Sequence, residues 1–459
     1  MYDSAIIHLS DLECGDNNRA ERPSRVDGYR RCADRLVEDI QRLLFTEREL
    51  RSDRIGLIIT GDIANKGSDA EYEKAAEVVG RIRSRLGIPN RQVAILPGNH
   101  DVSRPACEQE FHRQFPHLRG EDEIDRREAR GLAEKFVSFN RFCRSTCGYD
   151  FGGPESVMLF DGFLTLGVAL VALDTSYPCT FHPDDNFGLL RDLAIERAGE
   201  CLRRAVAGAD RPVPVAALHH CLLPFADQIG DDKSYCRNGS EALVWLTEAG
   251  FGVVLCGHEH QTKCLGELRT GYRVLATGSY GLNATSLVHR YSGAARADSN
   301  KYQILLVQKD ETSSLLFRRL RTPGGFDDSW GPDDSDGGAA IYLRLPRRYL
   351  GGTSEQERLT QQANLLVAGP SRMRSGRLMI TMSLRAPRDT LGMINVVSYR
   401  VGDRGPLIES RNREDGFLRD EEVVSGNSIC VQAWFETDLG RLGPLVVEIP
   451  GREVALAAH

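Results

Sequence analysis

Acidic, amide and imidazole side chains follow five apolar runs in the first 260 residues of this 459-residue chain. The runs with their polar ends read IIHLSDLE, LIITGD, AILPGNHD, VAALHH and VVLCGHEH. Carboxylate oxygen, amide oxygen and imidazole nitrogen together form a borderline ligand set, which suits Mn, Fe or Zn better than Ca or Mg alone. The residue types therefore predict a site for divalent metals. The candidate residues are Asp11, Glu13, Asp62, Asn99, His100, Asp101, His219, His220, His258 and His260.

The elements that must position these residues are short strands, because each motif directly follows an apolar run typical of a buried strand. Helical patterns alternate with the runs, over residues 27–50 and from Asp69 to Leu86. Ser68 and Glu71 form a capping-box pattern at the start of the second helix, and Gly87 ends it. In an open α/β sheet the carboxyl ends of neighbouring strands face one crevice. The five motifs are therefore predicted to converge.

In this order the motifs resemble those of the calcineurin-like metallophosphoesterases, which read DxH, GD, GNH(D/E), H and GHxH. The resemblance covers roughly residues 1–345. It implies an α/β fold with a two-layered β-sheet core flanked by helices, a four-layer α/β/β/α sandwich. It also implies two divalent metal ions, with Mn²⁺ expected first and Fe, Zn or Mg as alternatives.

The resemblance implies a role for each matching residue. Asp62 would bridge the two metals, His100 would protonate the leaving oxygen as general acid, and Asp101 would orient the His100 ring. The remaining ligands would be Asp11 and His260 at the first metal, and Asn99, His219 and His258 at the second.

Glu13 departs from the family pattern, which has histidine at this position. A glutamate replaces a neutral nitrogen with an anionic, harder oxygen, which should shift the first site towards Mn or Mg and away from Zn. Alternatively, Glu13 reaches the metal only through water, which would leave that site weak or labile. Because the other ligands are intact, we expect an active enzyme.

The expected reaction is phosphoester hydrolysis. Two cations held roughly 3.5–4 Å apart neutralise phosphoryl oxygens and lower the pKa of a bridging water, which allows attack by a metal-bound hydroxide. His100 can carry a proton near neutral pH, since the unperturbed pKa of histidine is near 6.5. A general acid helps most when the leaving group is poor, as a sugar alkoxide is. The first expectation is therefore a phosphodiesterase that acts on a nucleotide-type phosphodiester.

Two alternatives stay open. A metal-dependent DNA or RNA nuclease would normally need a basic face, and the net charge of −7 argues against one, although arginines could cluster in space. In the second alternative, Glu13 has weakened the metal site and the chain is a binding module.

Substrate contacts are expected in three places. Arg19, Arg22 and Arg25, in the loop after Glu13, could clamp a second phosphate, although a solvated loop is the simpler interpretation. His220, next to His219, is a candidate contact with the substrate. Residues 104–147 read as a helical cap inserted over the crevice, and the segment 177–188 is expected to shape specificity with it.

The chain is long enough for more than one domain. Residues 1–350 are predicted to form the catalytic domain, with YQILLVQ, SSLLFRRL and IYLRLP as its last strands. Residues 351–370 read as a linker. Residues 371–459 contain short apolar strands and predict a small all-β domain, with an immunoglobulin-like sandwich as the first expectation. A protein partner or self-association is expected there.

The sequence also bears on the compartment. No apolar stretch approaches the roughly 18 residues that a membrane helix needs, so no membrane partner is expected. The N-terminus lacks a basic region and an apolar signal core before the first strand. The twelve cysteines are scattered, without a CxxC pair. We therefore expect a reduced, cytoplasmic protein. The PGNHDVSR segment and the appended β domain also make the chain resemble bacterial metallophosphoesterases.

Overall fold

The computed structural model describes most of the chain. The described residues are 3–15, 25–207, 212–222, 236–258, 262–267, 272–277, 301–308, 312–320, 330–332, 340–344, 364–372, 378–385, 388–402, 406–412, 417–423, 428–437 and 440–449.

The first sheet begins with three parallel strands, β1 (Ser4–Leu9), β2 (Ile55–Thr60) and β3 (Val93–Leu96). All three are buried along their whole length, as their apolar sequences predict. Helices α1 (Arg25–Ile40) and α2 (Asp69–Leu86) belong to this half, and a π-helical stretch, Gln41–Thr46, extends α1. The helices predicted over residues 27–50 and 69–86 are therefore present, the second with the predicted bounds.

The second sheet has six strands in the order β4-β5-β6-β7-β9-β8. β5 (Val168–Leu173), β6 (Val213–Ala217), β7 (Val253–Cys256) and β9 (Tyr272–Thr277) are parallel. The antiparallel edges are β4 (Val157–Leu159) and β8 (Thr262–Glu267). Helices α6 (Asp192–Ala207) and α7 (Gly239–Ala249) follow β5 and β6 in the chain.

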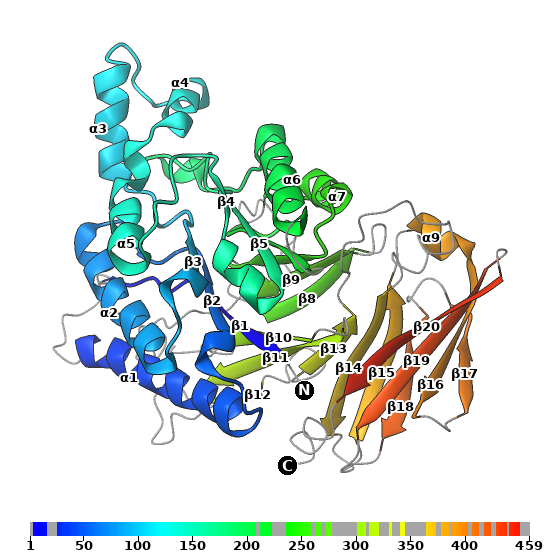
Figure 1. The fold of residues 1–459 in the computed structure, drawn as a ribbon. Coiled ribbons are helices and arrows are strands. Elements are labelled where there is room, and N and C mark those ends of the chain that lie inside the picture. The colour runs from blue at the N-terminus through cyan, green and yellow to red at the C-terminus, as the bar shows by residue number, and fades with distance from the viewer. Residues whose placement is uncertain are drawn as a thin grey trace, which may run out of the picture.

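The two sheets pack face to face with helices outside them. Along β5, Val168, Leu170 and Ala172 join the same buried cluster as β1–β3, whereas the alternate residues pack in the cluster of α6 and α7. Because successive side chains of a strand point to opposite faces, β5 must lie between these two layers. Figure 1 shows α1 and α2 on one side of the sheets and α6 and α7 on the other. The predicted four-layer α/β/β/α arrangement is confirmed.

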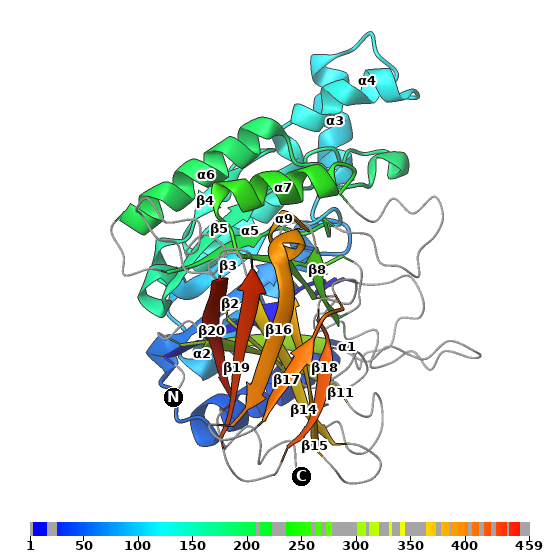
Figure 2. The same cartoon turned by 90° about the vertical axis from the view of Figure 1, so that its right-hand side faces the viewer.

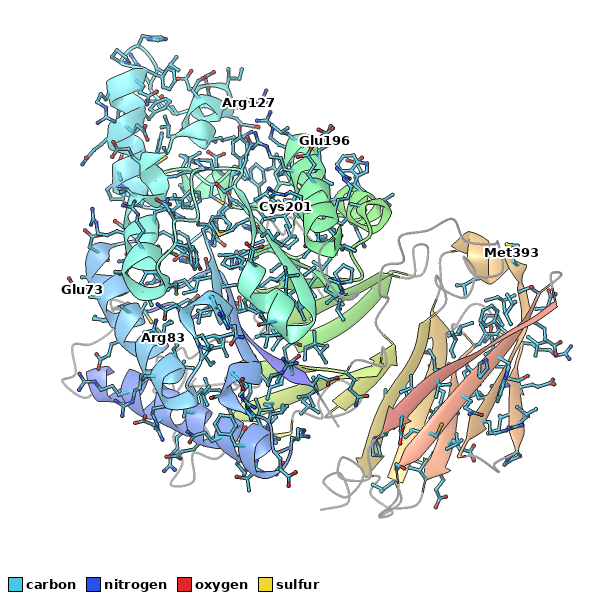
Figure 3. All side chains as sticks on the ribbon, viewed as in Figure 1. Glu73, Arg83, Arg127, Glu196, Cys201 and Met393 are labelled. Carbon is cyan, nitrogen blue, oxygen red and sulfur yellow. The ribbon has the colours of Figure 1, made fainter. Side chains whose placement is uncertain are left out.

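Residues 104–147 form the predicted helical insertion, but it has two parts. α5 (Val137–Cys147) packs against α2, and its Phe139 and Phe142 belong to the main core. α3 (Arg104–Gln114) and α4 (Glu123–Arg127) project from the body and have a small apolar cluster of their own (Figure 1). In Figure 3 the labelled Arg127 marks this projecting part, and the labelled Glu196 marks α6. Short helical turns of the domain are Ser52–Arg54, Asn90–Gln92, Glu128–Gly131, Glu134–Phe136, Asp161–Leu166 and Pro183–Asp185.

The first sheet continues beyond β1 into the last third of the chain. Its order is β18-β15-β14-β13-β11-β10-β1-β2-β3, with β12 paired to β11. The predicted strands YQILLVQ, SSLLFRRL and IYLRLP correspond to β10, β11 and β13. The added strands are β10 (Lys301–Val307), β11 (Thr312–Leu320), β12 (Trp330–Pro332), β13 (Ala340–Arg344), β14 (Asn364–Arg372), β15 (Leu378–Arg385) and β18 (Arg419–Val423).

A four-stranded antiparallel sheet, in the order β17-β16-β19-β20, packs on β14, β15 and β18 through a third buried cluster. Figure 2 shows this sheet facing the viewer in front of β14 and β15. The predicted all-β sandwich is therefore present. Its other elements are α9 (Arg388–Met393), β16 (Ile394–Val401), β17 (Leu407–Ser410), β19 (Ile429–Thr437) and β20 (Gly440–Ile449).

The linker predicted over residues 351–370 is wrong in its second part. β14 begins at Asn364 and pairs with β13, with Leu366 opposite Leu343 and Ala368 opposite Ile341. The polar residues before β14 and the Gly–Pro pair within it are typical of a connection, which is why the segment was predicted as a linker. Its alternating residues Leu365 and Val367 are nevertheless buried. Backbone hydrogen bonds thus join the sandwich to the catalytic sheet.

Among the described helices, none has the length and apolar character that crossing a membrane requires.

Candidate metal centre

The polar motifs lie at the carboxyl ends of their strands, as predicted. Asp11 follows β1 and Asp62 follows β2, and the GNHD motif follows β3. On the second sheet, His219 follows β6 and His258 follows β7. Because the two sheets are stacked, the loops from both meet at one end of the sandwich.

Four of these loop residues have left-handed backbone conformations. The φ angles are +55° at Asp11, +43° at Glu13, +52° at Asp62 and +71° at His258. Such angles are uncommon for residues other than glycine, and they concentrate where a site constrains the chain. They turn the side chains that follow β1, β2 and β7 towards one another.

Two glycines allow the loops to approach closely. At Gly61 φ is +91°, and an added Cβ would lie 2.5 Å from His219 Nδ1. A Cβ at Gly98 would lie 2.4 Å from the backbone nitrogen of Asp62. Only glycine permits this contact between the loops after β2 and β3. The GD and GNHD motifs therefore need their glycines for spacing.

Three potential ligand atoms surround a fourth, His219 Nε2. Asn99 Oδ1 lies 2.9 Å from this nitrogen, His258 Nδ1 lies 3.1 Å from it and Asp62 Oδ2 lies 3.2 Å from it. Ligands about 2.0–2.2 Å from one transition-metal ion are themselves about 3.0–3.5 Å apart. His219 Nε2 thus lies within this spacing of three other candidate ligand atoms, and the four side chains are the residues expected at the second metal.

The electrostatics of His219 also favour a cation. Its Nδ1 donates to the Thr60 carbonyl oxygen at 2.6 Å, so Nε2 is the nitrogen that faces the other ligands. Burial opposes a charge on the ring, but the Asp62 carboxylate raises the pKa of His219 to about 10. Burial likewise opposes ionisation of Asp62, yet His219 and His100 lower the pKa of that carboxyl. A metal ion could replace the proton that this arrangement otherwise holds.

The first metal site is described in part. Asp11, Asp62 and His219 offer ligand atoms within 4.8 Å of one another, and both Asp11 oxygens lie 3.2 Å from the His258 backbone N–H. His260 lies outside the described residues. Within the described part of the chain, Glu13 belongs to neither group of three potential ligands.

His100 lies beside these ligands. Its backbone N–H donates to Asp62 Oδ1 at 2.8 Å, and its Nδ1 lies 2.8 Å from the Asn65 carbonyl oxygen. Burial lowers the pKa of His100, but the charge of Asp62 and the bond to Asn65 outweigh it, and the pKa is raised. Because Nδ1 donates to Asn65, Nε2 remains to exchange a proton.

The expectation that Asp101 orients the His100 ring is wrong. The Asp101 carboxylate accepts hydrogen bonds from the backbone N–H groups of Ile63, Ala64 and Gly98 and from the Tyr72 hydroxyl. Burial and the Asp62 charge raise its pKa to about 6. Asp101 therefore holds the loops after β2 and β3 together. The Asn65 carbonyl orients the ring instead, and a backbone acceptor leaves no signal in the sequence.

His220 is fully buried next to this centre. It forms a second group of three potential ligands with His219 and His258. Its Nδ1 lies 2.9 Å from Thr175 Oγ1. Burial and the neighbouring histidines lower the pKa of His220 well below its usual value.

The arginines predicted to bind substrate lie outside the side chains that the structure describes. Arg19 and Arg22 lie outside the described residues, and Arg25 is described only as the first residue of α1, without its side chain.

Two charged residues near the site were not predicted from the sequence to have a role there. Asp174 directly follows β5, just as the candidate metal ligands follow their strands. Burial raises the pKa of Asp174 to about 6, although the positive charge of Lys135 acts in the opposite direction. Lys135 is fully buried, and its Nζ donates to the carbonyls of Arg130, Tyr177 and Cys179 at 2.7–3.0 Å. Lys135 thus joins the insertion to the segment 177–188.

A second contact joins the same two regions, because the buried Arg126 of α4 pairs with Asp185 at 3.0 Å. The two segments predicted to shape specificity together are therefore in direct contact.

The chain belongs to the calcineurin-like phosphoesterases, because the family's sequence model matches residues 5–262, more than half of its length. Members are metal-dependent phosphoester hydrolases with a dinuclear divalent metal centre. An uncharacterised metallophosphoesterase-like protein, YydB of Bacillus subtilis strain 168, is 41% identical over 71 residues. That match covers 16% of this chain and 14% of YydB.

Solved structures in this comparison are similar at low sequence identity. A dimetal phosphatase from Danio rerio is 10% identical, with a TM-score of 0.39 over 70% of this chain and 97% of that chain. The purple acid phosphatase PPD1 from yellow lupin is 11% identical, with a TM-score of 0.39 over 71% of this chain and 53% of that chain.

Proposed function

We propose that this protein is a phosphodiesterase that hydrolyses a nucleotide-type phosphodiester with two divalent metal ions, Mn²⁺ first among them. The observation that carries the proposal is the convergence of Asn99, Asp62 and His258 on His219 Nε2, with the His100 ring beside them. This arrangement supports metal binding and proton transfer at one place.

The metal ligands in this proposal come from both sheets. When bound, the two ions would neutralise phosphoryl charge and provide a nucleophile from water. The Thr60 carbonyl orients His219 so that Nε2 faces the metal position. The ligands are Asp11, Asp62, Asn99, His219, His258 and His260, with Glu13 as an additional ligand to the first ion, directly or through water.

His100 is the proposed general acid. Its Nδ1 is bound to the Asn65 carbonyl, and its pKa is raised, so Nε2 can hold a proton near neutral pH. Proton donation matters most when the departing oxygen is a poor leaving group. The substrate preference is therefore for diesters that release a sugar alkoxide or another alkoxide.

The test compares two leaving groups. Wild type and His100→Ala are assayed with bis(p-nitrophenyl) phosphate, whose leaving group needs little protonation, and with a nucleotide phosphodiester, whose alkoxide needs it. We expect Mn²⁺-dependent hydrolysis of both substrates by the wild type. We expect His100→Ala to lose about 10²–10⁴-fold in kcat with the nucleotide and clearly less with the aryl diester.

The control is His117→Gln, which changes an exposed histidine of the insertion and should hydrolyse both substrates as the wild type does. Equal losses with both leaving groups would remove His100 from the role of general acid. Preferential hydrolysis of p-nitrophenyl phosphate by the wild type would contradict the diester proposal and indicate a phosphatase.

The metal preference depends on Glu13. A harder oxygen ligand favours Mn²⁺ over Zn²⁺ at the first site, so Glu13→His should shift the preference towards Zn²⁺. The measurement is metal content after dialysis against equal Mn²⁺ and Zn²⁺, for wild type and variant. An unchanged Mn to Zn ratio would exclude Glu13 from the metal site.

The C-terminal sandwich is proposed as a surface for a protein partner or for self-association. Light scattering after gel filtration gives the oligomeric state, and pull-down with the whole chain tests for a partner.

A further inference from the structure

His220 makes two hydrogen-bond contacts with one hydroxyl. Its backbone N–H donates to Thr175 Oγ1 at 3.1 Å, and its ring Nδ1 lies 2.9 Å from the same oxygen. Thr175 directly follows Asp174 at the end of β5 and is fully buried. The two residues come from adjacent strands of the second sheet, β5 and β6.

This geometry favours one of the two ring nitrogens as the carrier of the hydrogen. A threonine hydroxyl has one hydrogen to donate, and Oγ1 already accepts from the His220 backbone N–H. Within the described residues, His220 Nδ1 is the acceptor in reach of that hydroxyl hydrogen. With Nδ1 as the acceptor, the hydroxyl uses its one hydrogen, and in a neutral ring the remaining hydrogen is then on Nε2.

The Nε2–H donor is buried and, among the described residues, has no hydrogen-bond partner. Buried donors in proteins are nearly always paired, so such a donor indicates a ligand acceptor or an ordered water. A nitrogen that carries hydrogen has no lone pair for a metal ion. His220 is thus suited to an oxygen acceptor, unlike His219.

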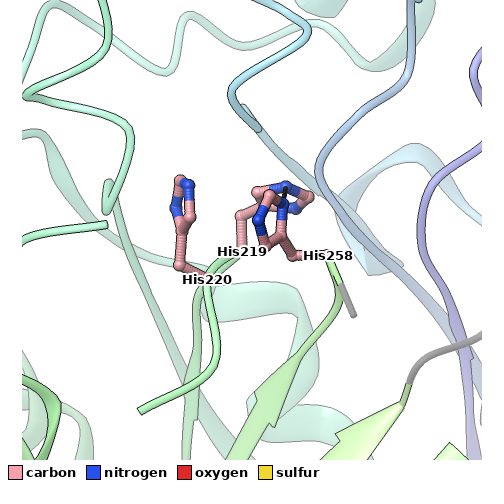
Figure 4. Close-up of side chains that lie close together, drawn as sticks. All are labelled: His219, His220 and His258. Carbon is pink, nitrogen blue, oxygen red and sulfur yellow. Dashed lines mark hydrogen bonds between the residues drawn. The ribbon is translucent and has the colours of Figure 1, made fainter. Parts of the chain in front are cut away.

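The ring lies at the metal centre. Its centroid is 4.5 Å from that of His258 and 5.0 Å from that of His219. Figure 4 shows the His220 ring next to the rings of His219 and His258, which meet edge to face. An added Cβ at Gly188 would lie 2.5 Å from His220 Cβ, so the backbone of the segment 177–188 packs directly behind the ring.

We propose that His220 is a neutral Nε2–H donor that binds a phosphoryl oxygen of the substrate, and that Thr175 is the positioning residue that fixes this tautomer. The proposal rests on the proposed phosphoesterase function, because divalent ions at His219 and His258 would draw the oxygens of a phosphate to this place. It assigns His220 to the substrate and not to the metals.

The first experiment reads the tautomer directly. Long-range ¹H–¹⁵N correlation spectra of metal-free whole protein labelled with ¹⁵N-histidine distinguish a protonated Nε2 from a protonated Nδ1, and His220→Gln assigns the signal. We expect the Nε2–H form at His220 in the wild type and in Thr175→Ser. We expect a mixture of tautomers in Thr175→Val, which lacks the hydroxyl. A protonated Nδ1 in the wild type would overturn the proposal.

The second experiment measures binding of inorganic phosphate to the Mn²⁺-loaded protein by calorimetry, with metal content determined for each variant. Losing one hydrogen bond to an anion should weaken phosphate binding at least about tenfold in His220→Ala. His220→Gln keeps an N–H at the position of Nε2 and should bind within about threefold of wild type. Thr175→Val should weaken binding and Thr175→Ser should restore it, while His117→Gln serves as the matched control.

The outcomes separate the two proposals. Loss of bound metal in His220→Ala would make His220 a metal ligand and overturn the inference, and unchanged phosphate binding with full metal content would also overturn it. Failure of the wild type to hydrolyse any phosphoester would refute the proposed function, whereas the tautomer and the phosphate affinities would still decide the role of His220.

Discussion

The His219 ring lies between the Thr60 carbonyl on one side and the oxygens of Asn99 and Asp62 on the other. Each ring nitrogen faces an acceptor, so without a metal the ring must be protonated, which agrees with its pKa of about 10. The site is therefore arranged for a positive charge at Nε2. A divalent ion and a proton compete for that nitrogen.

Replacing this residue tests the centre most directly. His219→Ala removes the atom on which the other ligands converge, and we expect metal affinity to fall more than about a hundredfold, since even residues behind the ligands contribute 10–100-fold. Metal content by mass spectrometry and the rise in melting temperature with added Mn²⁺ measure the effect. Full metal retention by the variant would contradict the assignment of the centre.

A second prediction at the residue scale concerns His8, which lies in β1 and bonds Thr60 Oγ1 at 2.8 Å and Gln303 Nε2 at 2.7 Å. Burial lowers its pKa to about 3, against about 6.5 in the unfolded chain. Between these values the unfolded state binds more protons. The stability that neutral His8 contributes is therefore fully present above about pH 6.5 and is lost as the pH falls towards 3.

Urea unfolding of the metal-free protein between pH 4.5 and 7.5 tests this. We expect His8→Gln to be less stable at pH 7.5 but to lose less stability with acid, with a slope smaller by up to about 1.4 kcal/mol per pH unit below about pH 6.5. His117→Gln should keep the wild-type slope. Parallel slopes for His8→Gln and wild type would show that His8 does not cause the acid sensitivity.

At the scale of elements, the helical insertion and the segment 177–188 depend on one buried lysine. Lys135 Nζ uses its three hydrogens on the carbonyls of Arg130, Tyr177 and Cys179. Burial lowers its pKa, while the nearby Asp174 opposes that effect. The same segment 177–188 packs behind His220 through Gly188. The insertion is thereby connected to the site.

Lys135→Met should break this connection. The variant leaves three carbonyls without their donor and Asp174 without its counter-charge, and we expect a loss of about 3–5 kcal/mol in unfolding free energy. Faster limited proteolysis within residues 104–136 and 177–188 should accompany it. Arg113→Met, which removes an exposed cation of the same insertion, should change stability by less than about 0.5 kcal/mol. Equal effects of the two substitutions would show that Lys135 does not hold the insertion and the segment 177–188 together.

At the scale of the whole molecule, one sheet of ten strands runs through the catalytic half and the C-terminal sandwich. β13 pairs with β14, and β20 of the second sandwich sheet lies against both. The two halves therefore share hydrogen bonds and apolar surface. A chain divided between them would expose a sheet edge, which promotes aggregation.

Truncation after residue 345 tests this continuity. We expect a chain of residues 1–345 to aggregate or to melt at least about 5 °C below the whole protein, because β13 becomes an unpaired edge. Gel filtration and differential scanning calorimetry measure the outcome. A monomeric fragment with the melting temperature of the whole protein would show that the sandwich is an independent unit.

Much of this arrangement could be predicted from local sequence. The apolar runs before Asp11, Asp62 and Asn99 have the length and composition of buried strands, and the Ser68–Glu71 pattern marked the start of α2. β14 was not predicted as a strand, because the polar residues before it and its Gly–Pro pair are typical of a connection. Pairing with β13 on one side and with β15 on the other makes it a strand, and pairing is not a local property.

Local sequence was enough to predict the family, the candidate metal ligands and the strand ends that carry them, because apolar periodicity and motif order are properties of neighbouring residues. The contacts of the Asn65 carbonyl with His100, of Asp101 with two loops and of Thr175 with His220 depend on the tertiary structure. These contacts join backbone atoms and side chains far apart in the chain. The stacking of the two sheets brings these partners together, and a local sequence pattern does not predict which residues will meet.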